Sequence, residues 1–230
     1  MNTRTADEIR IHHIDTMGEP LGCLYSSLWQ ETASIHQKWG EFLELFGKNE
    51  ERVKLLNDSA PQFFRMIQNV LWSDIILHIA RMTDPKKSAG KRNLSIQAIT
   101  ELLPEGDIKI STGELVKTAV SAASFCRDWR NRHLAHRDLD LSLDKSATPL
   151  EPASRASVKV ALEAIANVLN AVSYHYEKSE NFFNPVISHS GAEALLYVID
   201  EGVTSRNKRY ERISNRIFTK DDIEFHSRKI

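Results

Sequence analysis

This 230-residue sequence contains few cysteines and almost no net charge. Its two cysteines, Cys23 and Cys126, each lie in an apolar helical pattern, which favours small buried side chains over a disulfide. A formal net charge of −1 excludes a polycation, so any nucleic-acid surface must be a local patch. We see no apolar leader at the N-terminus and no segment as long as a membrane span. We therefore expect a cytoplasmic protein that does not bind membranes.

Strand-type alternation is also scarce, whereas apolar residues repeat at helical spacing along most of the chain. The clearest pattern predicts a helix from residue 21 to Gly47, with apolar positions at Leu24, Leu28, Ile35, Trp39, Phe42 and Phe46. A second helix, from Phe64 to Met82, must end before Pro85, because the residue before a proline avoids helical geometry. The economical architecture is an all-α bundle of four or five long helices.

Capping signals predict the remaining helix starts. A short helix is expected over about 95–103, and Ser111-Thr112-Gly113-Glu114 resembles a capping box that opens the next. Thr148-Pro149 predicts another start, and Ser190-Gly191 precedes a further helix. Residues 139–143 are interpreted as a loop. We divide the chain into an N-terminal arm or short helix (1–20), a helical domain (21–200) and a basic C-terminal tail or helix (201–230).

The most informative segment follows an Ala-rich apolar helix and concentrates cations and polar groups within residues 127–138. It contains Arg127, Arg130, Asn131, Arg132, His133, His136, Arg137 and Asp138. An imidazole can move protons, a guanidinium can bind a phosphate through two parallel hydrogen bonds, and an amide can orient either group. These are the groups that metal-free RNA cleavage requires. The alternative is a solvated helix C-terminus, where cations complement the negative end of the helix dipole.

The spacing leaves open which arginine would act with His136. On an uninterrupted α-helix, Arg130 and His136 lie roughly 120° from facing each other, since positions six apart complete one turn and two thirds. They can share a site if the helix ends or distorts near Leu134-Ala135, or if two chains pool their motifs. Arg132, four residues before His136, shares its face directly.

Two other interpretations of this segment, a kinase catalytic loop and a metal site, do not agree with its residues. His136-Arg137-Asp138-Leu139 resembles the start of a kinase catalytic loop, but Leu143 stands where that loop requires Asn, and no Gly-rich loop occurs. His133, His136 and Asp138 lack a further ligand for a metal, and the neighbouring arginines would repel a cation. We therefore expect no metal and no cofactor.

Several segments together resemble the HEPN superfamily, in particular its abortive-infection type U branch. They are Leu71 to Pro85 with its Arg-x-Thr-Asp-Pro ending, Asn93 to Ile96, Trp129 to Asp138 with the spacing Arg-Asn-x4-His, and Gly191 to Leu196. The resemblance covers roughly residues 20–200. It implies an HEPN-like up-and-down bundle of four to five helices with extra terminal helices.

The resemblance also implies a function and a set of partners. It implies a homodimer in which two motifs face a shared cleft, and metal-independent cleavage of RNA in phage defence or a toxin–antitoxin pair, with a cognate antitoxin protein as a partner. His136 would be the general acid and base, Arg130 would hold the phosphate, and Asn131 would position Arg130 or the substrate. Some HEPN proteins are noncatalytic, so the alternative is a helical module that binds RNA, nucleotide or a partner protein.

Further polar residues are candidates for supporting or RNA-binding roles. Asp74, His78 and Arg81 form one stripe on the second predicted helix, and Asp74 or Asp84 could orient a cation of the motif. An ordinary solvated face or internal ion pair explains this stripe equally well. Besides these, the supporting candidates are Arg132, His133 and Asp138. The basic loop 86–92, interpreted as flexible, and the basic run from Arg206 to Lys220 could contact the RNA backbone or could be solvated surface.

Overall fold

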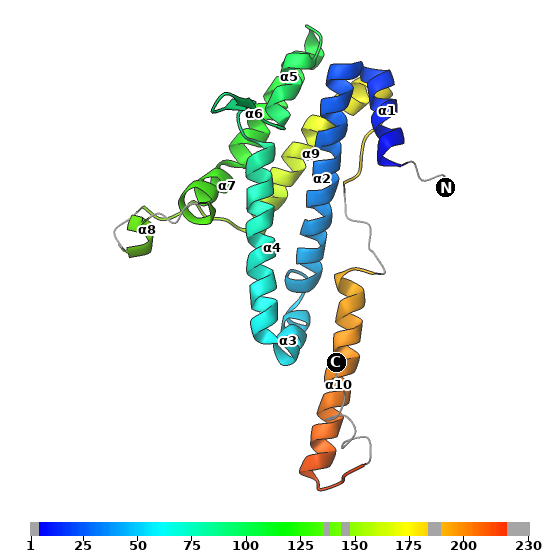
Figure 1. Cartoon of the computed structure of the whole chain (residues 1–230), viewed down its shortest axis with the longest axis vertical. Coiled ribbons are helices and arrows are strands. Elements are labelled where there is room, and N and C mark those ends of the chain that lie inside the picture. Colours follow the sequence, from blue (N-terminus) through cyan, green and yellow to red (C-terminus); the bar gives the residue numbers. More distant parts are fainter. Residues whose placement is uncertain (1–4, 136–138, 144–147, 184–189, 220–230) are drawn as a thin grey trace. The chain divides into compact units, whose positions relative to one another are not determined.

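The computed structural model describes residues 5–135, 139–143, 148–183 and 190–219. In these ranges the regular elements are helices, apart from a two-stranded hairpin, so the predicted all-α class is confirmed (Figure 1). The chain divides into two compact units. The larger unit comprises residues 1–40 and 70–185, and the smaller comprises 41–69 and 186–230.

The larger unit begins with a helical hairpin. α1 (Ala6–Met17) starts at a capping box in which Thr5 accepts from the Glu8 N–H and the Glu8 carboxylate accepts from the Thr5 N–H. Gly18, at φ 81°, turns the chain into α2 (Glu19–Phe46). Gly22 lets the two helices approach, because a Cβ there would lie 2.5 Å from the His13 carbonyl oxygen. Of the two forms expected for the arm, the structure has the helix.

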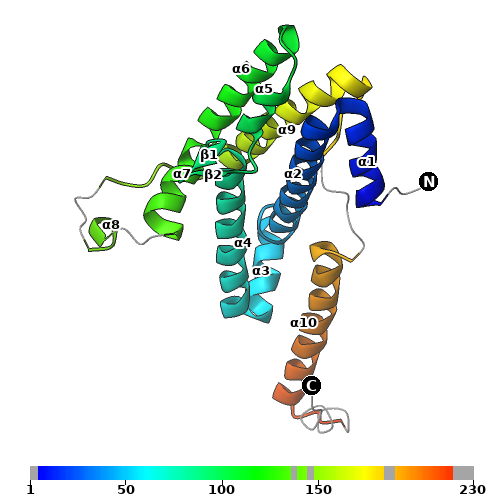
Figure 2. The same ribbon diagram turned by 45° about the horizontal axis from the view of Figure 1, so that its top comes forward.

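The core of the larger unit is built around α9 (Arg155–Glu177), which packs against α6 (Asp107–Ala122). Figure 2 shows α9 running beside α6. By length and composition α9 could cross a membrane, so our expectation that no segment reaches that length was wrong. Its apolar content has another explanation, because one face of α9 is buried in the core; that face carries Val158, Ala161, Leu162, Ala164, Ile165, Val168, Leu169 and Val172.

The end of α4 (Pro61–Met82) and the short elements that follow complete the larger unit. They are a hairpin of β1 (Lys87–Ser88) and β2 (Lys91–Arg92), the 3-10 turn η1 (Ile96–Ala98), α5 (Ile99–Leu102), α7 (Ser124–Trp129), the π-helical turn η2 (Arg130–Leu134) and α8 (Leu139–Leu143). The loop 86–92, interpreted as flexible, thus contains paired strands. Residues 139–143 are a short helix, which corrects their interpretation as a loop.

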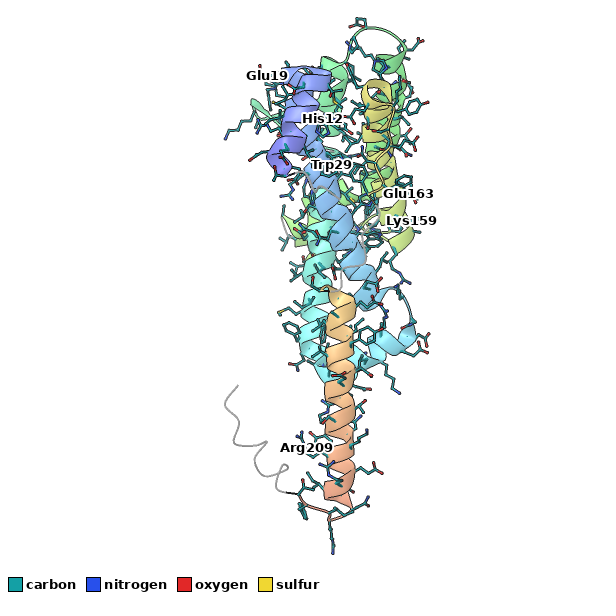
Figure 3. All side chains as sticks on the ribbon, turned by 90° about the vertical axis from the view of Figure 1, so that its right-hand side faces the viewer. His12, Glu19, Trp29, Lys159, Glu163 and Arg209 are labelled. Carbon is teal, nitrogen blue, oxygen red and sulfur yellow. The ribbon has the colours of Figure 1, made fainter. Side chains whose placement is uncertain are left out.

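The smaller unit contains the end of α2, α3 (Glu50–Ser59), the start of α4 and α10 (Ala192–Ser214), with α3 packed against α10. Asn49 caps α3 by accepting from the Arg52 N–H. The Glu41 carboxylate accepts from the Ala192 N–H at 2.6 Å, which places a negative charge at the N-terminus of α10. Helix α10 includes much of the basic C-terminal run, including Arg209, labelled in Figure 3.

Two predicted helix starts were wrong by several residues. α6 begins at Asp107, four residues before the expected capping box at Ser111. α9 begins at Arg155, where Ser154 accepts from the Ser157 N–H, and not at Thr148. Residues 148–151 do not enter α9, because their backbone groups are hydrogen-bonded to side chains of α7 and η2.

Candidate functional site

The C-terminal end of α4 is held in place by side chains from the segment that follows the hairpin. Helix ends leave carbonyl groups without intrahelical partners. Here Gln97 Nε2 donates to the Thr83 carbonyl at 2.9 Å, Ser95 Oγ donates to the Asp84 carbonyl, and Asn93 Nδ2 donates to the Pro85 carbonyl at 2.7 Å. These three bonds fix the backbone that carries the Asp84 side chain.

The helix formed by α7 and η2 carries the start of the Arg-Asn-x4-His motif, and we call it the motif helix. Its geometry changes at Arg130, the first residue of the motif. α7 continues into η2 at Arg130, and the Ala135 N–H donates to the Arg130 carbonyl at 2.8 Å, a bond that spans five residues. Such π turns are rare and are frequent at functional sites. Of the two arrangements that would let Arg130 and His136 share a site, a distorted helix and two pooled motifs, the structure has a helix distortion, which begins at Arg130. His136 and Asp138 lie outside the described residues.

Arg130 is held by two partners on different edges of its guanidinium. Its Nη1 donates to both carboxylate oxygens of Asp84 at 2.6 Å, and its Nε donates to Asn131 Oδ1 at 3.0 Å. The side chains of Arg130 and Asp84 are 24% and 18% exposed. Within the described ranges, Arg130 Nη2 has no hydrogen-bond partner. The guanidinium is therefore oriented, and one amino group remains available to a ligand.

Arg132 makes hydrogen bonds to Asp128 and to the backbone of Thr148. Its Nη2 donates to the Thr148 carbonyl at 2.6 Å, and its Nη1 lies 3.4 Å from Asp128 Oδ1. Asp128 Oδ2 also accepts from the Glu151 N–H at 2.8 Å, and Trp129 Nε1 donates to the Glu151 carbonyl at 2.8 Å. Arg132 and Asp128 thus attach residues 148–151 to the motif helix, which distinguishes Arg132 from Arg130.

The other cations of the motif also differ in their surroundings. His133 is exposed, and its ring lies edge-on to Trp129 with the ring centroids 5.5 Å apart. Arg127 donates from Nη2 to the Val120 carbonyl at 2.7 Å, and its Nη1 lies 3.4 Å from Thr83 Oγ1. Arg127 therefore links the motif helix to the end of α4 beside the Arg130–Asp84 pair.

The polar stripe of α4 mostly pairs with α2 and not with the motif. Lys38 Nζ donates to Asp74 Oδ2 at 2.6 Å, and His78 Nε2 lies 2.7 Å from Glu31 Oε2. Burial lowers the pKa of His78, and the nearby Glu31 carboxylate opposes part of that effect. Arg81 is exposed, and its side chain makes no hydrogen bond or ion pair to the described residues. Of the two candidate carboxylates, Asp84 and not Asp74 contacts the motif.

Sequence reasoning missed the second set of contacts around the motif, those of Arg127, Asp128 and Glu151. Asp128 stands four residues before Arg132, a spacing that brings side chains together on a helix and could have indicated their pairing. Nothing in the sequence indicates that Glu151 makes three hydrogen bonds with α7, accepting from Ser124 and Trp129 and donating to Asp128. Among the residues that the structure describes, no group of three or more His, Cys, Asp or Glu side chains could hold a metal ion.

Part of the basic C-terminal run is engaged within the smaller unit. Arg206 Nη2 donates to the Asp58 carbonyl, and Arg52 pairs with Glu44 and lies 3.8 Å from Glu193. Burial alone would raise the pKa of Glu44, but hydrogen bonds from Lys48 and Arg52 outweigh burial and lower it. Arg206 therefore contributes to helix packing within the smaller unit, whether or not the run also contacts RNA.

Comparison with protein families gives a match that covers most of the chain. A family model described as AbiU2, of the HEPN type, matches residues 18–195. The curated proteins and the solved structures gave no match. The matched range includes the end of α4 with Asp84, the π turn with Arg130 and Asn131, and the whole of α9.

Proposed function

The chain belongs to the AbiU2 family of the HEPN superfamily, and on that premise we propose that it is a metal-independent endoribonuclease. The observation that supports the proposal most directly is the Arg130 guanidinium, fixed by Asp84 and Asn131 with Nη2 left open. An oriented guanidinium stabilises the charge that develops on a phosphate during transfer without moving at the moment of reaction.

The reaction uses the substrate's own hydroxyl as the nucleophile. The 2′-oxygen bonds to the adjacent phosphorus while the bond from phosphorus to the 5′-oxygen breaks. A base takes the 2′-hydroxyl proton, and an acid gives a proton to the leaving 5′-oxygen. The products are a cyclic phosphate and a free 5′-hydroxyl. In this proposal His136 exchanges the protons, since imidazole titrates near neutral pH, and Arg130 binds the phosphate oxygens.

We propose that the active form is a homodimer in which two motifs face one cleft. One motif supplies few groups that can transfer a proton, and a second copy in the same cleft would double their number. A stable dimer should bury roughly 1,200 Å² or more. Sedimentation should then give twice the 26.2 kDa mass of the chain, and a strict monomer at tens of micromolar would contradict the shared site.

The proposed setting is the cytoplasm, in phage defence or in a toxin–antitoxin pair. A cytotoxic ribonuclease needs control, and a cognate antitoxin protein would supply it. An adjacent nucleotidyltransferase or phage-defence gene would support this setting.

A noncatalytic module is the second candidate, and one contact favours it. Asp84 neutralises much of the Arg130 charge, and its carboxylate would compete with a phosphate for the same guanidinium. Such a module would bind RNA, nucleotide or a partner protein without cutting RNA.

One experiment separates the two candidates. Purified protein is incubated with end-labelled RNA in EDTA, and the products are analysed for cyclic phosphate and 5′-hydroxyl ends. We expect cleavage by the wild type, none by His136→Ala, and near-normal cleavage by His133→Ala, the matched exposed histidine. No cleavage by the wild type under broad conditions would assign the chain to the noncatalytic module. Loss in EDTA with rescue by zinc would instead make the two histidines metal ligands.

A further inference from the structure

The β1–β2 hairpin leaves the end of α4 and presents four cations within residues 86–92, with no acidic residue among them. We propose that this hairpin binds the phosphate backbone of single-stranded RNA and holds the strand beside Arg130. The inference rests on the proposed RNA chemistry, but RNA binding tests it separately from cleavage.

The hairpin has a defined register that fixes which side chains face each other. Lys87 lies opposite Arg92, and Ser88 lies opposite Lys91, around a two-residue turn of Ala89 and Gly90. Both turn residues have positive φ, 47° and 80°, as a type I′ turn requires. The Asn93 N–H donates to the Lys86 carbonyl at 2.9 Å, which continues the ladder by one pair.

This register places two cations where they repel each other most. The pairs at 86/93 and 88/91 are the hydrogen-bonded ones, so Lys87 and Arg92 form the intervening pair, in which side chains approach closest. Like charges directly opposite on antiparallel strands are destabilising. An anion between Lys87 and Arg92 would turn that repulsion into attraction.

Among the cations of the hairpin, the Lys86 side chain pairs with Glu101. The side chains of Lys87, Lys91 and Arg92 are exposed and make no hydrogen bond or ion pair in the part of the chain that the structure describes. Arg92 adds to the effect of Lys86 in lowering the pKa of the Glu101 carboxyl. Three exposed positive charges therefore remain on a ribbon that is too short to bury an apolar partner.

The hairpin is anchored to the same backbone that carries Asp84. Asn93 bonds to the Pro85 carbonyl and to Ser88 Oγ, at 2.7 and 3.0 Å. Lys87 stands three residues after Asp84, so the chain between them spans at most about 11 Å. A strand whose phosphate contacts Arg130 would therefore meet the hairpin within a few nucleotides. This continuity favours a nucleic-acid backbone over an acidic protein as the ligand.

The test compares two triple variants that remove the same charge. One is Lys87→Gln, Lys91→Gln and Arg92→Gln. The control is Lys109→Gln, Lys117→Gln and Lys159→Gln, on α6 and α9; Lys159 is labelled in Figure 3. Both are made in the full chain with His136→Ala, so that the RNA stays intact. Binding of fluorescein-labelled single-stranded RNA is measured by anisotropy from 50 to 400 mM salt in EDTA.

We expect the hairpin variant to bind RNA roughly tenfold or more weakly at 100 mM salt. Its slope of log affinity against log salt should be smaller by about 2, since each lost phosphate contact on a single strand removes about 0.7. The control should retain affinity and slope. Equal affinity and slope for the two variants, or no RNA binding by the parent, would overturn the proposal. Neither result bears on cleavage by wild-type protein, which tests the proposed function.

Discussion

Two polar clusters lie along α4, one in the middle of the helix and one at its C-terminal end. In the middle, Asp74 pairs with Lys38, and the buried His78 imidazole, whose pKa is lowered by burial, lies beside Glu31, so both polar groups of α4 face α2. At the end, Asp84 holds one edge of Arg130 and leaves Nη2 available, on a π turn. The middle cluster contributes to the packing of α4 against α2, whereas the terminal cluster holds an oriented guanidinium with one amino group open. Incomplete pairing of an oriented charge is what a binding site requires.

Removing the cation of each cluster, Arg130 at the end of α4 or Lys38 beside its middle, should give the largest difference in RNA cleavage between the two clusters. Arg130→Ala should reduce RNA cleavage about a hundredfold or more, because it removes charge stabilisation in the transition state. Lys38→Ala, which breaks the matched pair in the middle of α4, should leave cleavage within about twofold. The measurement is kcat/KM on labelled RNA, with circular dichroism to establish the fold. Equal losses for both variants would remove the distinction between the clusters.

Neutralising the anion tests whether Asp84 positions Arg130. Asp84→Asn keeps the shape but weakens the hold on Nη1, so cleavage should fall about tenfold, mainly in kcat. Asp84→Glu should recover part of the rate if orientation is the role of this carboxylate. If Asp84 instead competes with phosphate for Arg130, the Asp84→Asn variant should bind RNA more tightly than the wild type, and its cleavage rate should not fall.

The middle cluster should affect how the stability of the folded protein depends on pH. Burial lowers the pKa of His78 below its ordinary value of 6.5, with Glu31 and Asp74 opposing and Lys38 and Arg81 adding to that effect. Burial likewise lowers the pKa values of His13 and His36. The unfolded chain then binds more protons than the folded one just below pH 6.5, so stability should fall as pH falls through this range.

The measurement is the melting temperature between pH 5 and 8 for wild type and His78→Gln. The variant should show a shallower decline, because it lacks one of the three described imidazoles whose pKa is lowered by burial. The exposed His133→Gln is the control for replacing an imidazole at the surface. A profile for His78→Gln that parallels the wild type would mean that this imidazole contributes nothing to the pH dependence.

The smallest expected effect concerns the hairpin beside the terminal cluster. Lys87→Gln should stabilise the free protein by a few tenths of a kcal/mol, because it relieves the repulsion across the strands from Arg92. Chemical denaturation of wild type and variant measures the difference, with Lys117→Gln as the exposed control. A destabilised Lys87→Gln would show that the two cations do not repel each other in the folded chain.

The helices with strong apolar periodicity were predictable, and the contacts of the site were only partly so. α2 and α4 follow from their apolar spacing and from Gly47 and Pro85. The starts of α6 and α9 did not follow, because Gly106 caps α6 without a side-chain bond and residues 148–151 bond to α7 instead. Periodicity describes the face of one helix, whereas Asp84 and Arg130 are 46 residues apart. Choosing Asp84 over Asp74 therefore required the tertiary structure.

The π turn at Arg130 amounts to one extra residue accommodated inside a helix. Deleting a single residue from 131–134 would let the segment close as a regular α-helix, with better hydrogen bonds and greater local stability. Ala135 would then bond to the Arg130 carbonyl across four residues instead of five, so the side chains after the deletion would keep roughly their present orientation relative to Arg130. The π turn therefore stores one residue more between Arg130 and Ala135 than a regular α-helix would hold, at the cost of poorer hydrogen-bond geometry.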